Sequence, residues 1–273
     1  LWGSTFGGVA RLSGDIAAGT YGQRSSDTGI AVGADYKLSS DTLVGFALSG
    51  TGSNWNSAHG LGQGYSEGFQ FGLRGQTSFG ALYGSAAAVW SGQWISTSRN
   101  AFGDGLNASY FGQSYSGRLE SGVRLGGELA GWSPYTAVEH VTFHNPSYRE
   151  RETGLGSFAL AFASNISSAT RTEFGTRYEN ATIVGNGQAL RLALKASWAH
   201  QWSSGDELKA QFVALPGSYF FINGTKSARD LAVFSGEATL QLSRSMELNA
   251  FLKADFNSSY TNIAGRFGLR VLW

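Results

Sequence analysis

The sequence predicts an all-β chain that folds as an antiparallel transmembrane β-barrel, and three observations support this. Segments along the whole chain alternate apolar and polar residues with a period of two, as expected of strands with one apolar face. Only 14% of the residues are charged, compared with about 25% in a typical soluble domain. Glycine is abundant, at 39 residues, and the chain has only three prolines and no cysteine, which suits long strands without disulfides.

The last segment of the chain shows the alternation most clearly. One face carries Arg266 and Arg270. The opposite face is apolar and consists of Ile263, Gly265, Phe267, Leu269, Val271 and Trp273. An aromatic residue at the carboxy terminus of such a face is typical of a strand that closes a membrane barrel.

Similar segments recur throughout the chain. The clearest apolar faces run through residues 30–38, 69–73, 190–198 and 248–256. Tight connections are expected at 39–41, 78–80 and 243–245, and long ones at 13–28, 51–65 and 92–107. Short and long connections alternate in this way in membrane barrels. About fourteen extended stretches can be counted in total, of which 158–163 and 208–214 are weak.

Charged residues indicate which face of each strand points away from lipid. An arginine or lysine in mid-membrane lipid costs roughly 2–4 kcal/mol, so charged side chains are expected in a polar lumen. Opposite charges recur two positions apart and are expected to neutralise one another. The residues singled out for the lumen are Arg74, Arg118, Glu120, Arg124, Glu139, Arg177, Arg191, Lys195 and Arg270. A structural ion network is the preferred interpretation, and a conducting or substrate-contacting role is the alternative.

Motifs for chemistry are weak. The net charge of +1 and the lack of a basic run argue against nucleic acid as a partner. Neither a phosphate loop, a nucleophile elbow nor a metal-spaced cluster is found, so no cofactor or metal is expected. His140 and His144 stand beside a polar loop, where a barrel hydrolase would place a site, although polar loop histidines are more often structural.

Aromatic residues are expected at the membrane edge. Trp198 and Trp202 flank His200, and this cluster is interpreted as an interfacial girdle. Trp2 and Trp273 are expected to join the girdle at the same edge.

Several short motifs together resemble the translocator (β) domain of monomeric autotransporters, the type Va secretion family. The matching elements are Leu1-Trp2-Gly3, Gly29-x-x-x-Gly33-Ala34-Asp35-Tyr36, Leu119-Glu120-Ser121-Gly122-Val123-Arg124, Pro134-Tyr135, Phe174-Gly175-Thr176-Arg177, Ser197-Trp198-Ala199-His200 and the terminal aromatic residue. These elements are spread over nearly the whole chain, and their order and spacing together match the family.

The resemblance implies one domain over residues 1–273, a 12-stranded barrel in the bacterial outer membrane with both termini on the periplasmic side. The count of 14 strands is then reduced, because 158–163 joins a long loop over about 147–167 and 207–228 forms another. The resemblance also implies a passenger and a pore-crossing linker helix, both expected outside this chain.

The expected function is to anchor the protein and to enable export of its own N-terminal passenger to the cell surface, without catalysis. The implied partners are the passenger and linker helix, the outer-membrane barrel assembly machinery, and lipid or lipopolysaccharide around a monomer. The nine charged residues above would contact the linker. Phe267, Leu269, Val271 and Trp273 would form the assembly signal. A small diffusion channel and an outer-membrane barrel hydrolase are the alternatives.

Overall fold

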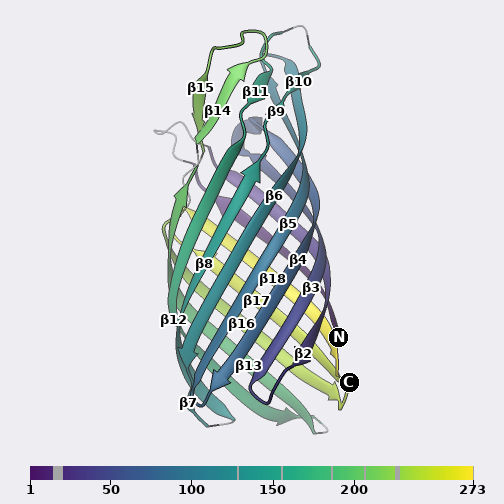
Figure 1. Cartoon of the computed structure of the whole chain (residues 1–273), viewed down its shortest axis with the longest axis vertical. Coiled ribbons are helices and arrows are strands. Elements are labelled where there is room, and N and C mark those ends of the chain that lie inside the picture. Colours follow the sequence, from purple (N-terminus) through teal and green to yellow (C-terminus); the bar gives the residue numbers. More distant parts are fainter. Residues whose placement is uncertain are drawn as a thin grey trace.

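The computed structural model describes residues 1–14, 21–127, 129–154, 156–185, 187–205, 207–224 and 228–272. Trp273 lies outside these ranges. In the described part of the chain, twelve strands form one closed antiparallel barrel (Figure 1). The predicted fold class and the count of 12 are therefore confirmed.

The barrel closes through its first and last strands. The wall consists of β1 (Trp2–Leu12), β2 (Gln23–Lys37), β3 (Thr42–Ser57), β4 (Gln63–Phe79), β5 (Leu82–Ala101), β6 (Asp104–Val123), β8 (Ala130–Asn145), β12 (Asn165–Val184), β13 (Gln188–Ser204), β16 (Asp230–Ser243), β17 (Met246–Phe256) and β18 (Tyr260–Val271). β1 pairs with β18 along its full length, from Trp2 opposite Arg270 to Leu12 opposite Tyr260. The two termini lie at one end of the barrel, called the terminal rim (Figure 1). The opposite end is the far rim.

The connections differ from the prediction at the far rim. The tight turns at the terminal rim occur as expected after β2, β4 and β16. The expected loops at 51–65 and 92–107 are wrong, because β3 and β4 are joined only around the 3₁₀ turn η2 (Ala58–Gly60), and β5 and β6 by Phe102 and Gly103. Both of these residues have positive φ, 53° and 96°, as in the tight turns that join twisted strands.

The wall is taller on one side than on the other. β17 has 11 residues and β18 has 12, which is close to the roughly 9 to 11 that a tilted strand needs to cross a membrane. β5, β6 and β12 have 20 each. Their extra length extends past the ends of β17 and β18, and outward residues there, such as Ser96 on β5 and Ser109 on β6, are polar, so these segments resemble loops in the sequence.

A second sheet, called the far sheet, lies above the barrel at the far rim (Figure 1). It consists of β15 (Phe220–Asn223), β14 (Glu207–Phe212), β11 (Leu160–Phe162) and β9 (Tyr148–Arg149) in that order. Two further short strands, β10 (Arg151–Glu152) and β7 (Leu125–Gly126), pair with β6 and β8. The weak segments 158–163 and 208–214 therefore lie outside the barrel wall, but they pair with each other, which the sequence did not predict.

Ionic and aromatic contacts attach the far sheet to the wall. Arg99 on β5 donates two hydrogen bonds of 2.6 Å to the carboxylate of Glu150. Tyr148 stacks between Tyr110 of β6 and Phe162 of β11, with ring centroids 4.1 and 4.6 Å apart. A bidentate pair of this kind fixes geometry as well as adding energy.

Large apolar side chains cover the outside of the barrel instead of a central core. Ile30 on β2 is 65% exposed and Leu252 on β17 is 59% exposed. On β18, Phe267, Leu269 and Val271 are exposed. They alternate with the arginines of the opposite face and point outward. Among the described residues, no helix is long and apolar enough to cross a membrane.

Candidate functional site: a charged network in the lumen

Several ion pairs of this protein cross the inside of the barrel. Arg171 on β12 lies 3.1 Å from Asp255 on β17, although β13 and β16 separate these strands. Arg118 on β6 reaches Glu173 on β12 at 3.3 Å, over β8. Side chains on non-adjacent strands of a closed barrel can meet only in its interior. These residues therefore face the lumen.

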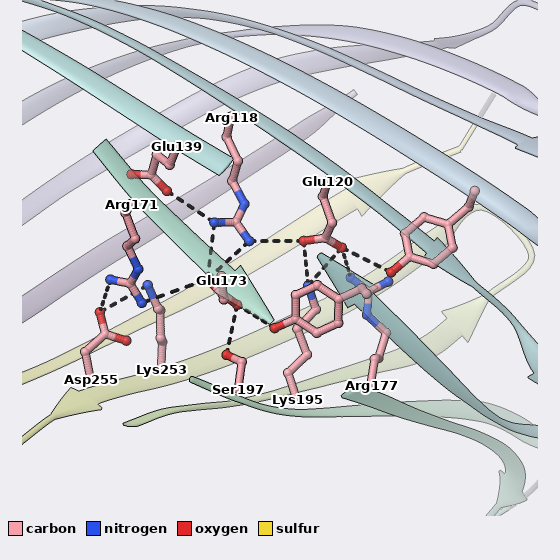
Figure 2. Close-up of polar contacts among 12 residues, drawn as sticks. Arg118, Glu120, Glu139, Arg171, Glu173, Arg177, Lys195, Ser197, Lys253 and Asp255 are labelled. Carbon is pink, nitrogen blue, oxygen red and sulfur yellow. Dashed lines mark hydrogen bonds and ion pairs between the residues drawn. The ribbon is translucent and has the colours of Figure 1, made fainter. Parts of the chain in front are cut away.

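The interior charges form one connected group, called the lumenal network (Figure 2). Its members are Tyr83, Arg118, Glu120, Tyr135, Glu139, Arg171, Glu173, Arg177, Lys195, Ser197, Lys253 and Asp255. Glu120 and Glu173 each contact four other members of the network. The contacts of Glu120 with its cationic partners are shorter than those of Glu173. The Glu120 carboxylate accepts hydrogen bonds from Lys195 at 3.1 and 3.0 Å, Arg177 at 3.0 Å, Arg118 at 3.1 Å and Tyr83 at 3.3 Å.

A second carboxylate, that of Glu173, connects the rest of the network. It accepts hydrogen bonds from the Tyr135 hydroxyl at 2.5 Å and from Ser197 at 3.0 Å, besides the contact with Arg118. Figure 2 shows Glu173 between the Glu120 group and the pair formed by Arg171 and Asp255. Glu173 is only 4% exposed. Buried carboxylates are stable as ions only when they are paired and hydrogen-bonded in this way.

The order of residues along the strands explains how the network forms. Charged residues two positions apart point to the same face of a strand, and lipid excludes them from the outer face. On β8, which separates β6 from β12, Ala137 lies directly between Glu120 and Glu173 in register. Its small side chain is buried, and it leaves room for the charges of β6 and β12 to meet above it.

Five of the nine predicted lumenal residues belong to the lumenal network: Arg118, Glu120, Glu139, Arg177 and Lys195. Three of the others lie near the terminal rim. Arg74 and Arg270 both pair with Asp35, at 2.6 and 3.3 Å, and Arg191 lies 3.9 Å from Glu247, which also contacts Arg270.

The ninth residue, Arg124, follows the end of β6. Its Nε lies 3.9 Å from Glu179, and half of its side chain is exposed. Asp35, Arg74, Arg191, Glu247 and Arg270 are called the terminal-rim group. The arginines of this group are 41–66% exposed and are less constrained than the lumenal network.

The selection of lumenal residues from the sequence left out part of the lumenal network. Lys253 and Asp255 alternate with apolar residues on β17, and this pattern indicates that they face the lumen. They are nevertheless absent from the nine predicted lumenal residues. Tyr83 begins a strand on which both faces carry apolar residues, and only its bond to Glu120 shows which one is inside. Tyr135 and Ser197 carry no charge, so the charge pattern does not mark them as lumenal, although both stand in motifs that resemble the family.

One aromatic residue lies on the face opposite to the prediction. Trp2 stands directly between Arg270 of β18 and Gly33 of β2. It therefore faces the lumen at the terminal rim and does not join a lipid-facing girdle. Its indole occupies the space that a Cβ at Gly33 would need. Glycine on the neighbouring strand makes room for a large ring inside the barrel.

The histidines lie outside the lumen. His140 points outward from β8, and its ring nitrogens contact the hydroxyls of Thr170 at 2.8 Å and Thr142 at 3.1 Å. Near the far rim, His200 contacts Asp230 at 2.8 Å and packs against Trp202. A general base for hydrolysis needs one ring nitrogen on the nucleophile and the other on an orienting carboxylate. Both ring nitrogens of His140 contact threonine hydroxyls, so neither contacts a carboxylate.

A closed barrel with an apolar outer surface and a charged lumen is an outer-membrane β-barrel. The autotransporter beta-domain family profile matches residues 1–253, and the chain belongs to this family. It is a protein of the bacterial outer membrane, of the class that mediates passenger export.

One curated relative and several solved structures are similar to the chain. An extracellular serine protease of Serratia marcescens is 22% identical over 272 residues, which are 98% of this chain and 25% of that protein. The chain thus spans about a quarter of that relative.

The similar structures include two translocator barrels. The translocator domain of NalP from Neisseria meningitidis has 12% identity and a TM-score of 0.75, covering 100% of this chain and 88% of that one. The beta domain of the Bordetella autotransporter BrkA has 15% identity and a TM-score of 0.73, covering 100% and 98%. At these identities the likeness establishes the shared fold.

Proposed function

We propose that this barrel anchors its own protein in the outer membrane and lets an N-terminal passenger reach the cell surface through the lumen, without catalytic turnover. The observation that carries this proposal is the charged lumen inside a lipid-facing wall. A closed barrel satisfies every backbone hydrogen bond in lipid, and a polar lumen can host a polypeptide. In this arrangement the terminal rim faces the periplasm and the far rim faces the outside.

The predicted linker-contacting residues divide into two roles. Arg74, Arg191 and Arg270 keep exposed side chains at the terminal rim, where an entering chain or linker helix would meet them first; Arg124 is similarly exposed. The remaining five, held in the lumenal network, present a fixed surface to that chain. Because buried pairs are expensive to separate, we propose that these five contact the linker without rearranging.

The last strand has a proposed role in assembly. Phe267, Leu269 and Val271 point outward beside the seam with β1, and Trp273 would continue their face by period. We propose that the barrel assembly machinery recognises this outward face of β18 before β18 pairs with β1. Lipid and lipopolysaccharide would surround the outward apolar band of a monomer.

Planar-bilayer conductance tests this function against a small diffusion channel. The barrel is measured with and without a helical segment fused ahead of Leu1. We expect the helix to reduce the conductance strongly, because it would occupy the lumen. A pore that stays equally open in both proteins would contradict the proposal.

A further inference from the structure

The lumen has two unlike walls. The lumenal network lies on β5, β6, β8, β12, β13 and β17, mostly on one side. On the other side, the strands β1 to β5 and β18 enclose most of a cavity of about 530 Å³. Six of its lining residues, called here the uncharged wall, are Gly8, Thr51, Ser53, Ser66, Gln70 and Gln93. They follow the lumenal alternation of their strands.

Two charged residues, Asp27 and Arg266, border the cavity, and each is paired with a neighbouring side chain. Asp27 lies between Gly8 and Ser53 in register and accepts a 2.5 Å hydrogen bond from Ser53. Arg266 lies 3.5 Å from Glu237, donates to Asn249 at 3.2 Å, and stands over the ring of Phe251. These contacts hold its guanidinium toward β16 and β17. Apart from Asp27 and the ring of Phe6, the side of the cavity formed by β1 to β5 is lined by hydroxyl, amide and glycine groups.

Hydroxyls and amides suit a moving chain of arbitrary sequence. Each of them can both donate and accept a hydrogen bond, so they can solvate a passing backbone whatever side chains it carries. Fixed charges would retain segments of opposite sign and repel segments of the same sign. The lumenal network is also interlocked, and breaking one member of a buried pair is strongly unfavourable.

We propose that the exported polypeptide passes along the uncharged wall, while the lumenal network stays closed as the opposite side of the conduit. This inference rests on the proposed export function. Arg74 of the terminal-rim group lies on the same side: Arg74, Gln70 and Ser66 follow one another along β4 from the terminal rim toward the far rim. An entering chain would meet Arg74 and Arg270 first and then the uncharged wall.

Site-specific photocrosslinking tests the route. A passenger is fused ahead of Leu1, and a photoreactive residue replaces Gln70 or Gln93 on the uncharged wall. The matched control is Ser235 on β16, which lies opposite Lys195 and Lys253 in register, on the network side. During export we expect several-fold more passenger crosslinks from Gln70 and Gln93 than from Ser235. Equal or stronger crosslinking from Ser235 would overturn the route.

A charge test covers the case in which a bulky photoreactive residue disturbs folding. Gln70→Glu is expected to slow export of an acidic passenger segment several-fold relative to a neutral one, whereas Ser235→Glu leaves the two equal. Heat-modifiable gel mobility verifies that each barrel is folded. The same discrimination in both variants, or in neither, would overturn the route.

The two proposals fail differently. If the unmodified barrel exports no passenger, the export function fails. If it exports normally but the crosslinks and the charge effect map to Ser235, only the route fails.

Discussion

The ammonium nitrogen of Lys195 on β13 lies 3.1 and 3.0 Å from the two carboxylate oxygens of Glu120 on β6, although β8 and β12 separate these strands in the wall. This ion pair links β13 to β6 directly across the lumen. Arg177 and Arg118 share the same carboxylate. Removing that carboxylate would leave three cations facing one another.

Glu120→Gln should therefore destabilise the folded barrel strongly. Breaking a buried ion pair from one side costs about 3–5 kcal/mol, and the Glu120 side chain is only 7% exposed. Glu139→Gln is the matched control, because this side chain is 38% exposed and an exposed pair contributes about 0–1 kcal/mol. Denaturant unfolding in detergent, followed by heat-modifiable mobility, measures both. Equal stability of the two variants would contradict the central place of Glu120.

Gly33→Ala tests the packing of Trp2 against the neighbouring strand. A Cβ at Gly33 would meet the indole of Trp2 and lie 2.5 Å from the carbonyl oxygen of Phe46. Overpacking of this kind typically costs about 1–3 kcal/mol. Gly75→Ala is the control, since nothing lies within 4 Å of the added atom. We expect only the first variant to lower the temperature at which the folded gel band disappears, and a similar shift in both would count against this packing.

Arg99→Ala should release the far sheet without opening the barrel. The variant removes both bonds to Glu150, whose side chain is 5% exposed, while the wall pairing of β5 is untouched. We expect several-fold faster protease cleavage within 146–163 and unchanged heat-modifiable mobility. Arg151→Ala, on the exposed side of β10, serves as the control. Cleavage at the same rate in both variants would show that the Arg99 contact does not hold the sheet.

Leu269→Lys distinguishes an assembly signal from the cost of placing a charge in lipid. That cost is about 2–4 kcal/mol at the membrane centre and falls toward the edges. Leu252 lies in the middle of β17, whereas Leu269 is two residues from the end of β18. If the last strand is read during assembly, Leu269→Lys should reduce folded barrel in the membrane more than Leu252→Lys does. The opposite order would mean that lipid cost alone governs both.

The sequence predicts the parts of this fold that lipid selects. Alternation through segments such as 30–38 and 248–256 marks the membrane strands, because one face must be apolar and the other polar. The strand ends at 51–57 and 92–101 resemble loops in the sequence, because outward residues there, such as Asn54 and Ser96, are polar and give no apolar alternation. The pairing of Leu160 with Phe212 in the far sheet joins segments about fifty residues apart. No local pattern encodes that register.

The sequence predicts which charged residues face the lumen, but it does not predict which of them form ion pairs with one another. Charge alone placed Arg118 and Glu120 inside, yet it did not distinguish them from Arg74 and Arg270 at the rim. Which charges meet depends on strand order, stagger and the small side chain of Ala137 between them. Trp2 shows the limit of hydrophobicity as a guide, because the glycine that admits it inside lies on another strand.

Surface exposure of a passenger tests the central claim most directly. An epitope-tagged polypeptide is fused ahead of Leu1, and protease is added to intact cells. Export through this barrel predicts that the tag is cleaved in intact cells while the barrel keeps its folded, heat-modifiable mobility. A tag that stays protected until the outer membrane is permeabilised, although the barrel is folded, would contradict the account.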